Sequence, residues 1–448
     1  MSMSIHTLEE ILEVLEQHER QAAHVLNMVP AENSMSTVAK LPMLLDVYHR
    51  YLFNVAEAPD EWNFRGAQGV ARLEAQALAL LRELTGAEYV NLRPLSGLHG
   101  MTLVLSALGN GPGSTVLSVA PEQGGHYATA SLAARLGLRT YFMTGPDAHT
   151  IDFEHLANAL LEHRPALVYI DQSNCLFPLD VRKLSEVVHL TAPGTLVHVD
   201  CSHWMGLVLG RQMPNPLEVG ADSFGGSTHK SFPGPQKAIF ATHREDLSKR
   251  FYQAQYEMIS SHHLAGAISL GLALLEFKQR GGLQYAATMV ENTLEFGRQL
   301  HARKVPVVAT DRGFSAGHQL WIRTALMGVD AFQASERLYR VGIRVNAFPG
   351  LPGIPEPVLR IGLNEATYLG LLPEDMATLA ETFTEALMGR EPSPQTISAL
   401  RHHRRGATTS ADPQTLARVL GLVARAMMPG VQVDVSLLAQ TLLGSVRS

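Results

Sequence analysis

Apolar residues change their spacing from segment to segment along the chain, and this spacing predicts which segments are helices and which are strands. Residues 8–26 and 70–85 carry apolar residues three or four apart, the second run ending at Gly86, so we expect helices there. From that glycine onward, short apolar runs alternate with helical stretches. The strand-like runs are 87–92, 114–120, 140–145, 166–173 and 195–203, and the helical stretches are 101–108, 127–137, 153–163 and 180–191.

This alternation is typical of a parallel sheet with helices on both faces. After Phe251 the pattern changes, because apolar helices are expected at 264–280 and 287–303, followed by short strands within 317–364. We therefore predict an α/β protein in which a large, mainly parallel sheet domain precedes a smaller α+β domain. The expected parts are an N-terminal helix and arm at 1–66, the large domain at 67–260, the small domain at 261–388, and a linker with a helical tail at 389–448.

The last part of the chain differs in composition from the rest. Residues 389–413 are rich in proline, serine and arginine and predict a linker, in which the basic run Arg401–Arg405 is expected to be solvated. Two apolar helices are expected after it, at 414–430 and 436–446. We find no internal repeat and no low-complexity tract.

The composition excludes several classes of protein. The 448 residues are 46% hydrophobic and 17% charged, which is ordinary for a soluble globular enzyme. A net charge of −6 gives no electrostatic basis for binding nucleic acid or a membrane, and no apolar run approaches the length of a membrane span. Only two cysteines and an acidic N-terminus unlike a signal peptide predict a cytoplasmic location. The twenty histidines show no metal-binding spacing, so we expect no metal site.

Polar residues follow the ends of several predicted strands. Because ligands bind at the carboxyl ends of the strands in parallel sheets, these residues are expected to line one pocket. They are Ser96–Gly97, Gly124–Gly125–His126, Asp171–Gln172–Ser173, Asp200–Cys201–Ser202–His203 and Thr228–His229–Lys230.

Lys230 lies in the stretch GGSTHKSFPGPQK, residues 225–237, where small residues and two prolines surround one His-Lys pair. A surface turn would explain such a lysine by itself, but a lysine at the floor of a pocket can form a Schiff base with pyridoxal phosphate (PLP). That chemistry needs a carboxylate at the pyridine nitrogen, a phosphate cradle at a helix start and a flat group against the ring. Asp200, the turn Ser96–Leu98 and His126 supply these groups. Each has a simpler explanation as a turn acid, a helix cap or a structural histidine, and their order at successive strand ends favours the cofactor hypothesis.

Several motifs resemble those of the serine hydroxymethyltransferase branch of fold-type I PLP enzymes, over roughly residues 8–388. The resemblance implies the seven-stranded type of sheet found in those enzymes, PLP as the cofactor, and a homodimer with shared active sites. Part of the phosphate cradle would then come from residues 260–266 of the second subunit. The motifs are AEN at 31–33, NLRPLSG at 91–97, GGH at 124–126, DQS at 171–173, VDCSH at 199–203, STHK at 227–230 and LRIG at 359–362.

The same resemblance implies roles for individual residues. Lys230 would form the Schiff base, Asp200 would bind the pyridine nitrogen and His126 would stack on the ring. Either Glu57 or Glu61 would be the carboxylate that handles protons. Arg360 and Asn33 would contact the substrate, and His203 would be a further catalytic residue. The remaining contacts with the cofactor would come from Ser96, Gly97, Leu98, Ser173, His203, Thr228 and His229.

The chain departs from the hydroxymethyltransferases near the place where they bind folate. The stretch EWNFRGA has Asn63 and Phe64 where that family has two tyrosines, and Pro233 stands where an arginine follows the lysine. These stretches and GGHYATASLA at 124–133 are more similar to the threonine transaldolases of natural-product pathways. Those enzymes cleave L-threonine to acetaldehyde through a glycyl quinonoid and pass the glycine unit to another aldehyde, without folate.

We therefore expect a folate-independent L-threonine transaldolase that makes a new β-hydroxy-α-amino acid. One alternative is a hydroxymethyltransferase that uses tetrahydrofolate and acts on serine or α-methylserine. A second alternative is a PLP-fold protein kept only for binding, although the presence of Asp200, Lys230 and Arg360 together argues against it.

Overall fold

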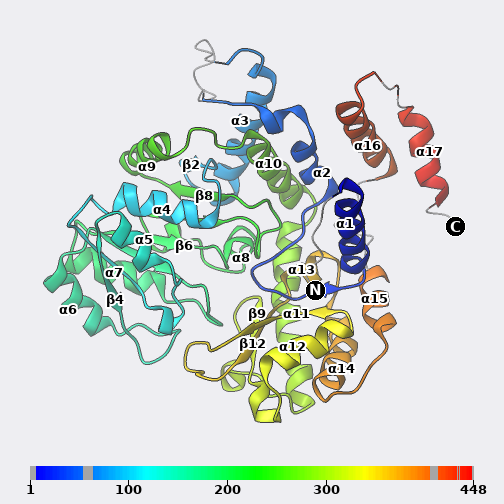
Figure 1. The fold of residues 1–448 in the computed structure, drawn as a ribbon. Coiled ribbons are helices and arrows are strands. Elements are labelled where there is room, and N and C mark those ends of the chain that lie inside the picture. Colours follow the sequence, from blue (N-terminus) through cyan, green and yellow to red (C-terminus); the bar gives the residue numbers. More distant parts are fainter. Residues whose placement is uncertain (1–6, 54–63, 404–411, 431, 433, 446–448) are drawn as a thin grey trace.

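The computed structural model describes residues 7–53, 64–403, 412–430, 432 and 434–445, and its largest sheet there has seven strands (Figure 1). Their order is β2-β8-β7-β6-β5-β3-β4, in which β8 is antiparallel to both neighbours and the other pairs are parallel. The predicted α/β class with a mainly parallel sheet is thus confirmed. The strands are β2 (Tyr89–Asn91), β3 (Thr115–Val119), β4 (Arg139–Met143), β5 (Leu167–Asp171), β6 (Leu196–Asp200), β7 (Ser223–Ser227) and β8 (Ala238–Thr242).

Helices cover both faces of this sheet (Figure 1). Successive side chains of a strand point to opposite faces, so Tyr169 of β5 joins one core while Val168 and Ile170 join the other. Burial on both faces explains why these strands are continuous apolar runs in the sequence. The first core contains α4 (Gly97–Leu108), α5 (Thr129–Arg135) and α9 (Glu245–Met258), and the second contains α3 (Gln68–Thr85), α6 (Phe153–His163), α7 (Val181–Thr191), α8 (Met205–Leu209) and α10 (Leu264–Gln279).

A separate core forms around an antiparallel sheet with the order β11-β12-β9. Helix α11 joins the two parts of the protein, because Met289 packs in the core of the large sheet and Phe296 packs in this one. Leu26 and Met28 near the N-terminus are also buried here. The elements are β9 (Gln319–Ile322), β11 (Asn346–Phe348), β12 (Val358–Gly362), α11 (Gly282–Ala302), α12 (Ala331–Arg340), α13 (Asn364–Tyr368) and α14 (Met376–Leu387), with β1 (Leu26–Asn27) parallel to β10 (Ile343–Arg344). The exact domain boundaries stay a prediction.

Three predicted helices have one end that differs from the structure by four or five residues. Helix α1 (Leu8–Ala22) stops short of residue 26, because β1 pairs with β10 instead. Helix α4 begins at Gly97 rather than at residue 101, since the Ser96 hydroxyl accepts the N–H of His99 and caps the helix. Helix α11 begins at Gly282, ahead of the predicted start at 287.

The predicted linker contains a helix, α15 (Pro394–His403). Its Ile397 is fully buried in the C-terminal core, and the Arg401 guanidinium donates to the carbonyls of Ala22 and Val25. The prediction of a solvated basic run is therefore wrong at Arg401, which ties this helix to the end of α1. Residues 404 and 405 of that run lie outside the described part.

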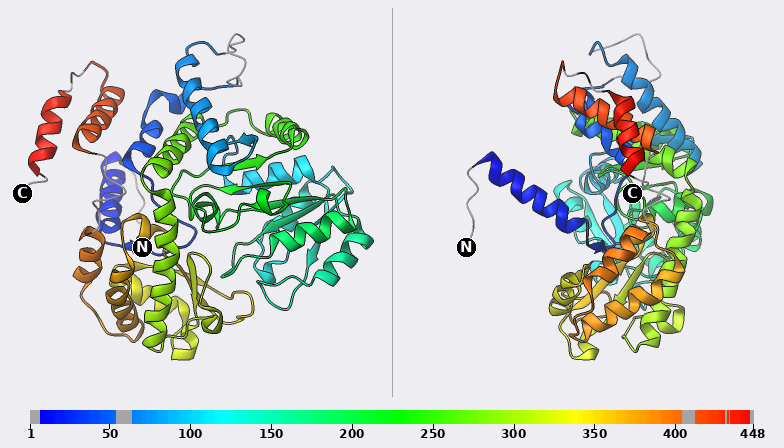
Figure 2. Two further views of the ribbon diagram at one scale, coloured as in Figure 1. Left: turned by 180° about the vertical axis from the view of Figure 1, so that it is seen from behind. Right: turned by 90° about the vertical axis from the view of Figure 1, so that its right-hand side faces the viewer.

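The predicted helical tail forms two helices, α16 and α17. Helix α16 packs against α17 and contacts α2 and η1, whereas α1 extends away from the body and buries none of its residues (Figure 2). Within the described ranges, no helix is both long enough and apolar enough to cross a membrane. The bounds are α2 (Thr37–Lys40), η1 (Leu41–Leu44), η2 (Asp46–His49), η3 (Pro121–Gln123), η4 (Pro216–Val219), η5 (Thr310–Arg312), η6 (Thr324–Met327), η7 (Pro373–Asp375), α16 (Pro413–Met427) and α17 (Val435–Ser445).

Candidate active site

A cavity of about 200 Å³ opens where β5, β6 and β7 end and α4 begins. This is the edge at which a parallel sheet places its ligands. Most of the residues predicted from the sequence meet there. The lining residues are Ser96, Gly97, Leu98, Met101, His126, Asp171, Gln172, Ser173, Asp200, Ser202, His203, Ser227, His229 and Lys230.

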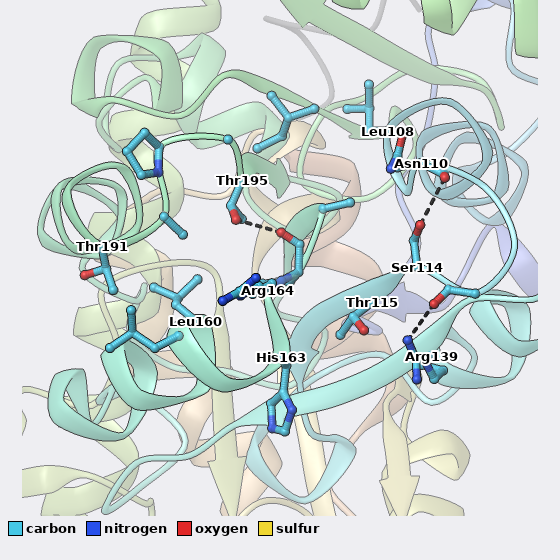
Figure 3. A pocket seen from close by; sticks show the side chains of 18 of the residues that line it. Leu108, Asn110, Ser114, Thr115, Arg139, Leu160, His163, Arg164, Thr191 and Thr195 are labelled. Carbon is cyan, nitrogen blue, oxygen red and sulfur yellow. Dashed lines mark hydrogen bonds between the residues drawn. The ribbon is translucent and has the colours of Figure 1, made fainter.

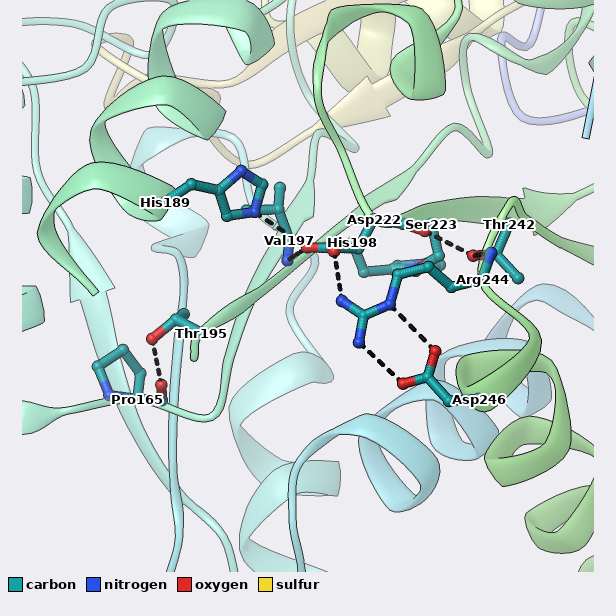
Figure 4. A network of polar contacts seen from close by, with 10 residues as sticks. All are labelled: Pro165, His189, Thr195, Val197, His198, Asp222, Ser223, Thr242, Arg244 and Asp246. Atoms are coloured by element: carbon teal, nitrogen blue, oxygen red, sulfur yellow. Dashed lines mark hydrogen bonds and ion pairs between the residues drawn. The ribbon is translucent and has the colours of Figure 1, made fainter. Parts of the chain in front are cut away.

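A second cavity, of about 780 Å³, lies at the opposite edge of the sheet, where the strands begin (Figure 3). Arg139 and Arg164 line it, but none of the predicted site residues does. Arg244 in its wall is held 2.8 Å from Asp222 and 2.8 Å from Asp246, so its charge is compensated (Figure 4). We therefore place the candidate site at the carboxyl ends of the strands.

The backbone around Lys230 is held from several sides. Its carbonyl accepts hydrogen bonds from the side-chain amides of Asn33, at 2.7 Å, and Asn364, at 3.2 Å. The Thr228 hydroxyl donates to the carbonyl of Pro235 at 2.7 Å and closes the loop that carries the lysine. Asn33 and Thr228 thus fix the lysine loop here, and a direct contact of either with a ligand stays a prediction.

The side chain of Lys230 is poised to act as a nucleophile. Burial lowers the pKa of Lys230 to about 8, with the charge of Asp200 raising it and that of Arg360 lowering it further. A larger fraction of the amine is therefore neutral near pH 7 than for an exposed lysine. The neutral amine is the form that attacks an aldehyde.

Asp200 is held rigidly at the end of β6. Its two carboxylate oxygens accept hydrogen bonds at 2.8 Å, one from the N–H of Ser202 and one from the hydroxyl of Tyr169. Gly226 on β7 has φ of +122°, and a Cβ at this position would lie 2.6 Å from the Asp200 carboxylate. Only glycine lets the neighbouring strand pass so close to this carboxylate.

A second carboxyl group, Asp171, lies beside Asp200 on the neighbouring strand β5. It is buried, it accepts a hydrogen bond from the Thr129 hydroxyl, and its Oδ1 has no hydrogen-bond partner among the described residues. Burial raises the pKa of Asp171 to about 8; the Thr129 hydrogen bond opposes this rise, and the negative charge of Asp200 adds to it. Sequence reasoning placed Asp171 in the pocket but assigned it no role, because its burial is visible only in the structure.

Replacing Asp171 with asparagine should flatten the pH dependence of stability. The folded pKa is raised, so the protonated carboxyl stabilises the fold at low pH and this contribution is lost as the pH rises toward 8. In the wild-type apoenzyme the group should lower the free energy of unfolding by up to about 1.4 kcal/mol per pH unit between pH 5 and 8. Denaturant unfolding of wild type, Asp171→Asn and the exposed control Asp311→Asn across this range measures the effect. Parallel profiles for all three proteins would refute it.

Three histidines around the cavity are kept neutral. Burial, followed by the charge of Lys230, lowers the pKa of His126, lowers that of His229 to about 4 and lowers that of His203 well below its usual range. His126 Nδ1 accepts the N–H of Ala128 at 3.2 Å, which fixes its ring. The amide of Gln319 lies 3.2 Å from Nδ1 of His203, which leaves Nε2 as the ring position that can carry the proton.

Ser96, Gly97 and Leu98 form the first turn of α4 at the cavity wall. The unpaired N–H groups of such a helix start favour a phosphate group. A Cβ on Gly97 would lie 2.9 Å from the Ser227 side chain, so the helix start and the end of β7 can meet only with glycine here. This close approach brings the helix start within the same pocket as Lys230.

Arg360 lies on β12 behind the cavity rather than in its wall. It is buried, and burial lowers its pKa to about 10. Its guanidinium donates to the Ser173 carbonyl at 3.3 Å and to the side-chain oxygens of Asn174 and Asn346. No carboxylate of the described residues pairs with it, and Nε has no hydrogen-bond partner among them. A buried cation of this kind suits a substrate carboxylate. Glu57 and Glu61 lie outside the described residues.

The chain matches the family described as serine hydroxymethyltransferase over residues 5–383. The chain belongs to the serine hydroxymethyltransferase family. A relative from a Streptomyces species, named L-threonine:uridine-5′-aldehyde transaldolase, is 43% identical over 86% of this chain and 93% of its own length. One of the same name from an Amycolatopsis species is 41% identical over 85% and 92%, and the serine hydroxymethyltransferase of Methanopyrus kandleri is 32% identical over 86% and 90%.

The crystal structure of L-threonine transaldolase from Pseudomonas fluorescens superposes with a TM-score of 0.81 and covers 92% of this chain and 96% of that one. At 24% identity it shows the fold. The cofactor of this serine hydroxymethyltransferase family member is PLP, and the residues present fit it. Lys230 would provide the amine, Asp200 the carboxylate, His126 a flat ring and the start of α4 the phosphate site. The protein is therefore a PLP-dependent enzyme.

Proposed function

We propose that this enzyme is an L-threonine transaldolase that works without folate. The observation that carries the proposal is the 41–43% identity, over 85–90% of this chain, to three relatives named L-threonine:uridine-5′-aldehyde transaldolase. In the proposed reaction the Cα–Cβ bond of threonine breaks and acetaldehyde leaves. A new bond then forms between the same Cα and the carbonyl carbon of a second aldehyde. No oxidant or reductant is consumed.

The residues of the site divide this work among them. Bound PLP supplies an electron sink, which allows a bond to Cα of the substrate to break. Asp200 would keep the pyridine nitrogen protonated, and Arg360 would hold the carboxylate of the amino acid so that the Cα–Cβ bond takes the reactive orientation. The neutral His203 lines the cavity and carries its proton on Nε2, so it would donate a hydrogen bond to the substrate rather than accept a proton from it, since its pKa is lowered well below the usual range.

A nucleoside aldehyde is the acceptor to test first, because the names of the relatives contain uridine-5′-aldehyde. With L-threonine and uridine-5′-aldehyde we expect a β-hydroxy-α-amino acid carrying the uridine, formed in equal amount to acetaldehyde. Mass spectrometry of the product and an enzymatic acetaldehyde assay follow the two sides of the reaction. The contrary result is release of acetaldehyde with no coupled product from this acceptor or from a panel of aromatic and aliphatic aldehydes. That result would show that the enzyme only cleaves threonine and would contradict the transaldolase proposal.

The second candidate is serine hydroxymethyl transfer with tetrahydrofolate, which the relatives of that name at 29–32% identity favour. It predicts that serine is cleaved and that the cleavage depends on folate. Measuring both amino acids with and without tetrahydrofolate separates the two candidates. The two cysteines are free and buried, which supports a cytoplasmic location for the enzyme whichever of the two functions it has.

We also propose that the enzyme is a homodimer in which α1 takes part in the interface. Four apolar residues spaced for one helix face, Leu8, Ile11, Leu12 and Leu15, are 45–68% exposed. A capping box at Thr7 and Glu10 stabilises the helix start, yet no residue of α1 is buried. A well-capped amphipathic helix that extends from the body and buries nothing is suited to a second subunit.

Charges on the apolar face of α1 should weaken this dimer. The double substitution Leu12→Glu and Leu15→Glu places two buried charges in the proposed interface, whereas Gln17→Glu alters the opposite, polar face of the same helix. Light scattering during size-exclusion chromatography should give a dimer for wild type and Gln17→Glu and a larger monomer fraction for the double variant. An unchanged dimer in the double variant would remove α1 from the interface.

A further inference from the structure

A second lysine of the stretch that carries Lys230 is buried. Lys237 is 2% exposed, and its Nζ donates to the carbonyl of Arg93 at 3.2 Å and to that of His262 at 2.8 Å. Burying an ammonium group is costly, and an ordinary fold would place an apolar residue there. A lysine at such a position indicates that its charge or its hydrogen bonds are needed.

Lys237 belongs to a buried ionic cluster. Arg93 makes a bidentate pair with Glu74, at 3.0 and 2.8 Å, and Nε2 of His262 lies 3.0 Å from the same carboxylate. Burial would raise the pKa of Glu74, but His262 and Arg93 together lower it to about 2, so it stays ionised. Among the described residues, Glu74 already pairs with Arg93 and His262, and the Lys237 ammonium is held by two backbone carbonyls.

The protonation of Lys237 depends on what lies near it. Burial lowers the pKa of Lys237 to about 7, the charge of Glu74 opposing this shift and that of Arg93 adding to it. An anion bound nearby favours the protonated form, because opposite charges stabilise each other in a buried setting. A phosphate group at the start of α4 should therefore increase the charged fraction of Lys237.

This cluster connects the turn before α4, whose first residues line the cavity, to the segment before α10. Arg93 closely precedes Ser96, the cap of α4, and Pro94 between them accepts the N–H of Ala238 at 3.4 Å. His262 stands just before α10, whose Gly266 lies so close to the Lys237 stem that a Cβ there would be 3.1 Å from it. The charge of Lys237 also reaches the first turn of α4, where, after burial, it helps to lower the pKa of His99.

We propose that Lys237 is a positioning residue for the phosphate group of PLP. It ties the turn before α4 to the segment before α10, and it places a buried positive charge behind the helix start that receives the phosphate. Apart from Lys230 and neutral histidines, no basic side chain of the described residues lines the cavity. The buried charge of Lys237 would then help to balance the charge of a phosphate group at the start of α4. The inference holds for whichever aldehyde the enzyme uses.

Cofactor affinity tests this role directly. PLP is titrated into the apoenzymes of wild type, Lys237→Met, Lys237→Arg and the surface control Lys278→Met, and binding is followed by absorbance. Lys237→Met should raise the dissociation constant for PLP by at least about tenfold, the scale of one charge-assisted hydrogen bond. Lys237→Arg should recover part of this loss, and Lys278→Met should match wild type. At saturating PLP the kcat of Lys237→Met should stay within about threefold of wild type, because Lys237 does not touch the reacting atoms.

Melting temperatures of the apo and holo forms separate positioning from a purely structural role. A positioning residue changes the difference between the two temperatures, since that difference reports the binding free energy of PLP. Equal shifts of both temperatures in Lys237→Met, or a dissociation constant within about twofold of wild type, would overturn the proposal. If Lys237→Met does not fold, Lys237→Gln, which keeps an N–H donor without the charge, decides in the same way.

Discussion

Lys230→Ala should abolish the absorption band of PLP held by the enzyme as a Schiff base and reduce kcat by roughly 10⁴-fold, the upper range for one positioned acid–base group. We expect this residue to supply the amine that holds the cofactor, and its pKa of about 8 suits it to exchange protons with the substrate as well. Because the backbone of its loop is held by Asn33, Asn364 and Thr228, the loop should keep its shape without the lysine side chain. The fold should therefore survive the substitution.

The surface variant Lys278→Ala is the control, since Lys278 pairs with the exposed Glu83 away from the cavity. Absorbance spectra, kcat and the melting temperature of the apoenzyme are compared for the two variants and wild type. A Schiff-base band that persists in Lys230→Ala would mean that another amine holds PLP. A collapse of the apoenzyme melting temperature would show that the residue is structural instead.

Asp200→Asn should lower kcat by roughly 10²–10³-fold, the range for removing one preorganised electrostatic contact. The asparagine can still accept the N–H of Ser202, so the geometry of the strand end is kept while the charge is lost. Asp200 also raises the pKa of Lys230, so the variant should bind PLP with an amine whose pKa is lower than about 8. The pH profile of PLP binding to the apoenzyme should therefore shift to lower pH.

Tyr169→Phe is the matched comparison for Asp200→Asn. It removes one hydrogen bond to the same carboxylate and leaves the charge in place. Its kcat should fall much less, by about tenfold or under, as expected for one hydrogen bond. Equal losses in the two variants would mean that the position of the carboxylate matters and that its charge does not.

The sequence predicted the sheet and the place of the site because both depend on local patterns. Apolar runs bounded by polar turns locate β3, β5 and β6. Because the carboxyl ends of parallel strands lie at the same edge of the sheet, the residues that follow these runs could be placed together. Lys230, Asp200 and His126 could be named since each lies directly after such a run or turn. The small-residue pattern around Lys230 corresponds to a loop whose neighbours leave no space, as Gly206 shows: a Cβ there would lie 2.3 Å from the Ser231 carbonyl.

Other features depend on contacts between distant segments and could not be predicted. The short β1 strand exists only because β10 lies beside it, and α15 exists in a polar segment because Ile397 finds the C-terminal core. The raised pKa of Asp171 results from burial next to Asp200, which no local pattern shows. Lys237 ends the stretch already noted for Lys230, yet the carbonyls that hold its side chain belong to segments that lie elsewhere along the chain.

The central claim is that threonine, without folate, is the substrate that this site activates. The most direct measurement is the visible spectrum of the purified holoenzyme, alone and with glycine, L-serine or L-threonine, each with and without tetrahydrofolate, together with acetaldehyde release. We predict a new long-wavelength band and acetaldehyde with L-threonine, both unchanged by folate. Activity with L-serine alone, appearing only when tetrahydrofolate is added, would contradict the account and make this protein a hydroxymethyltransferase in spite of Asn63 and Phe64.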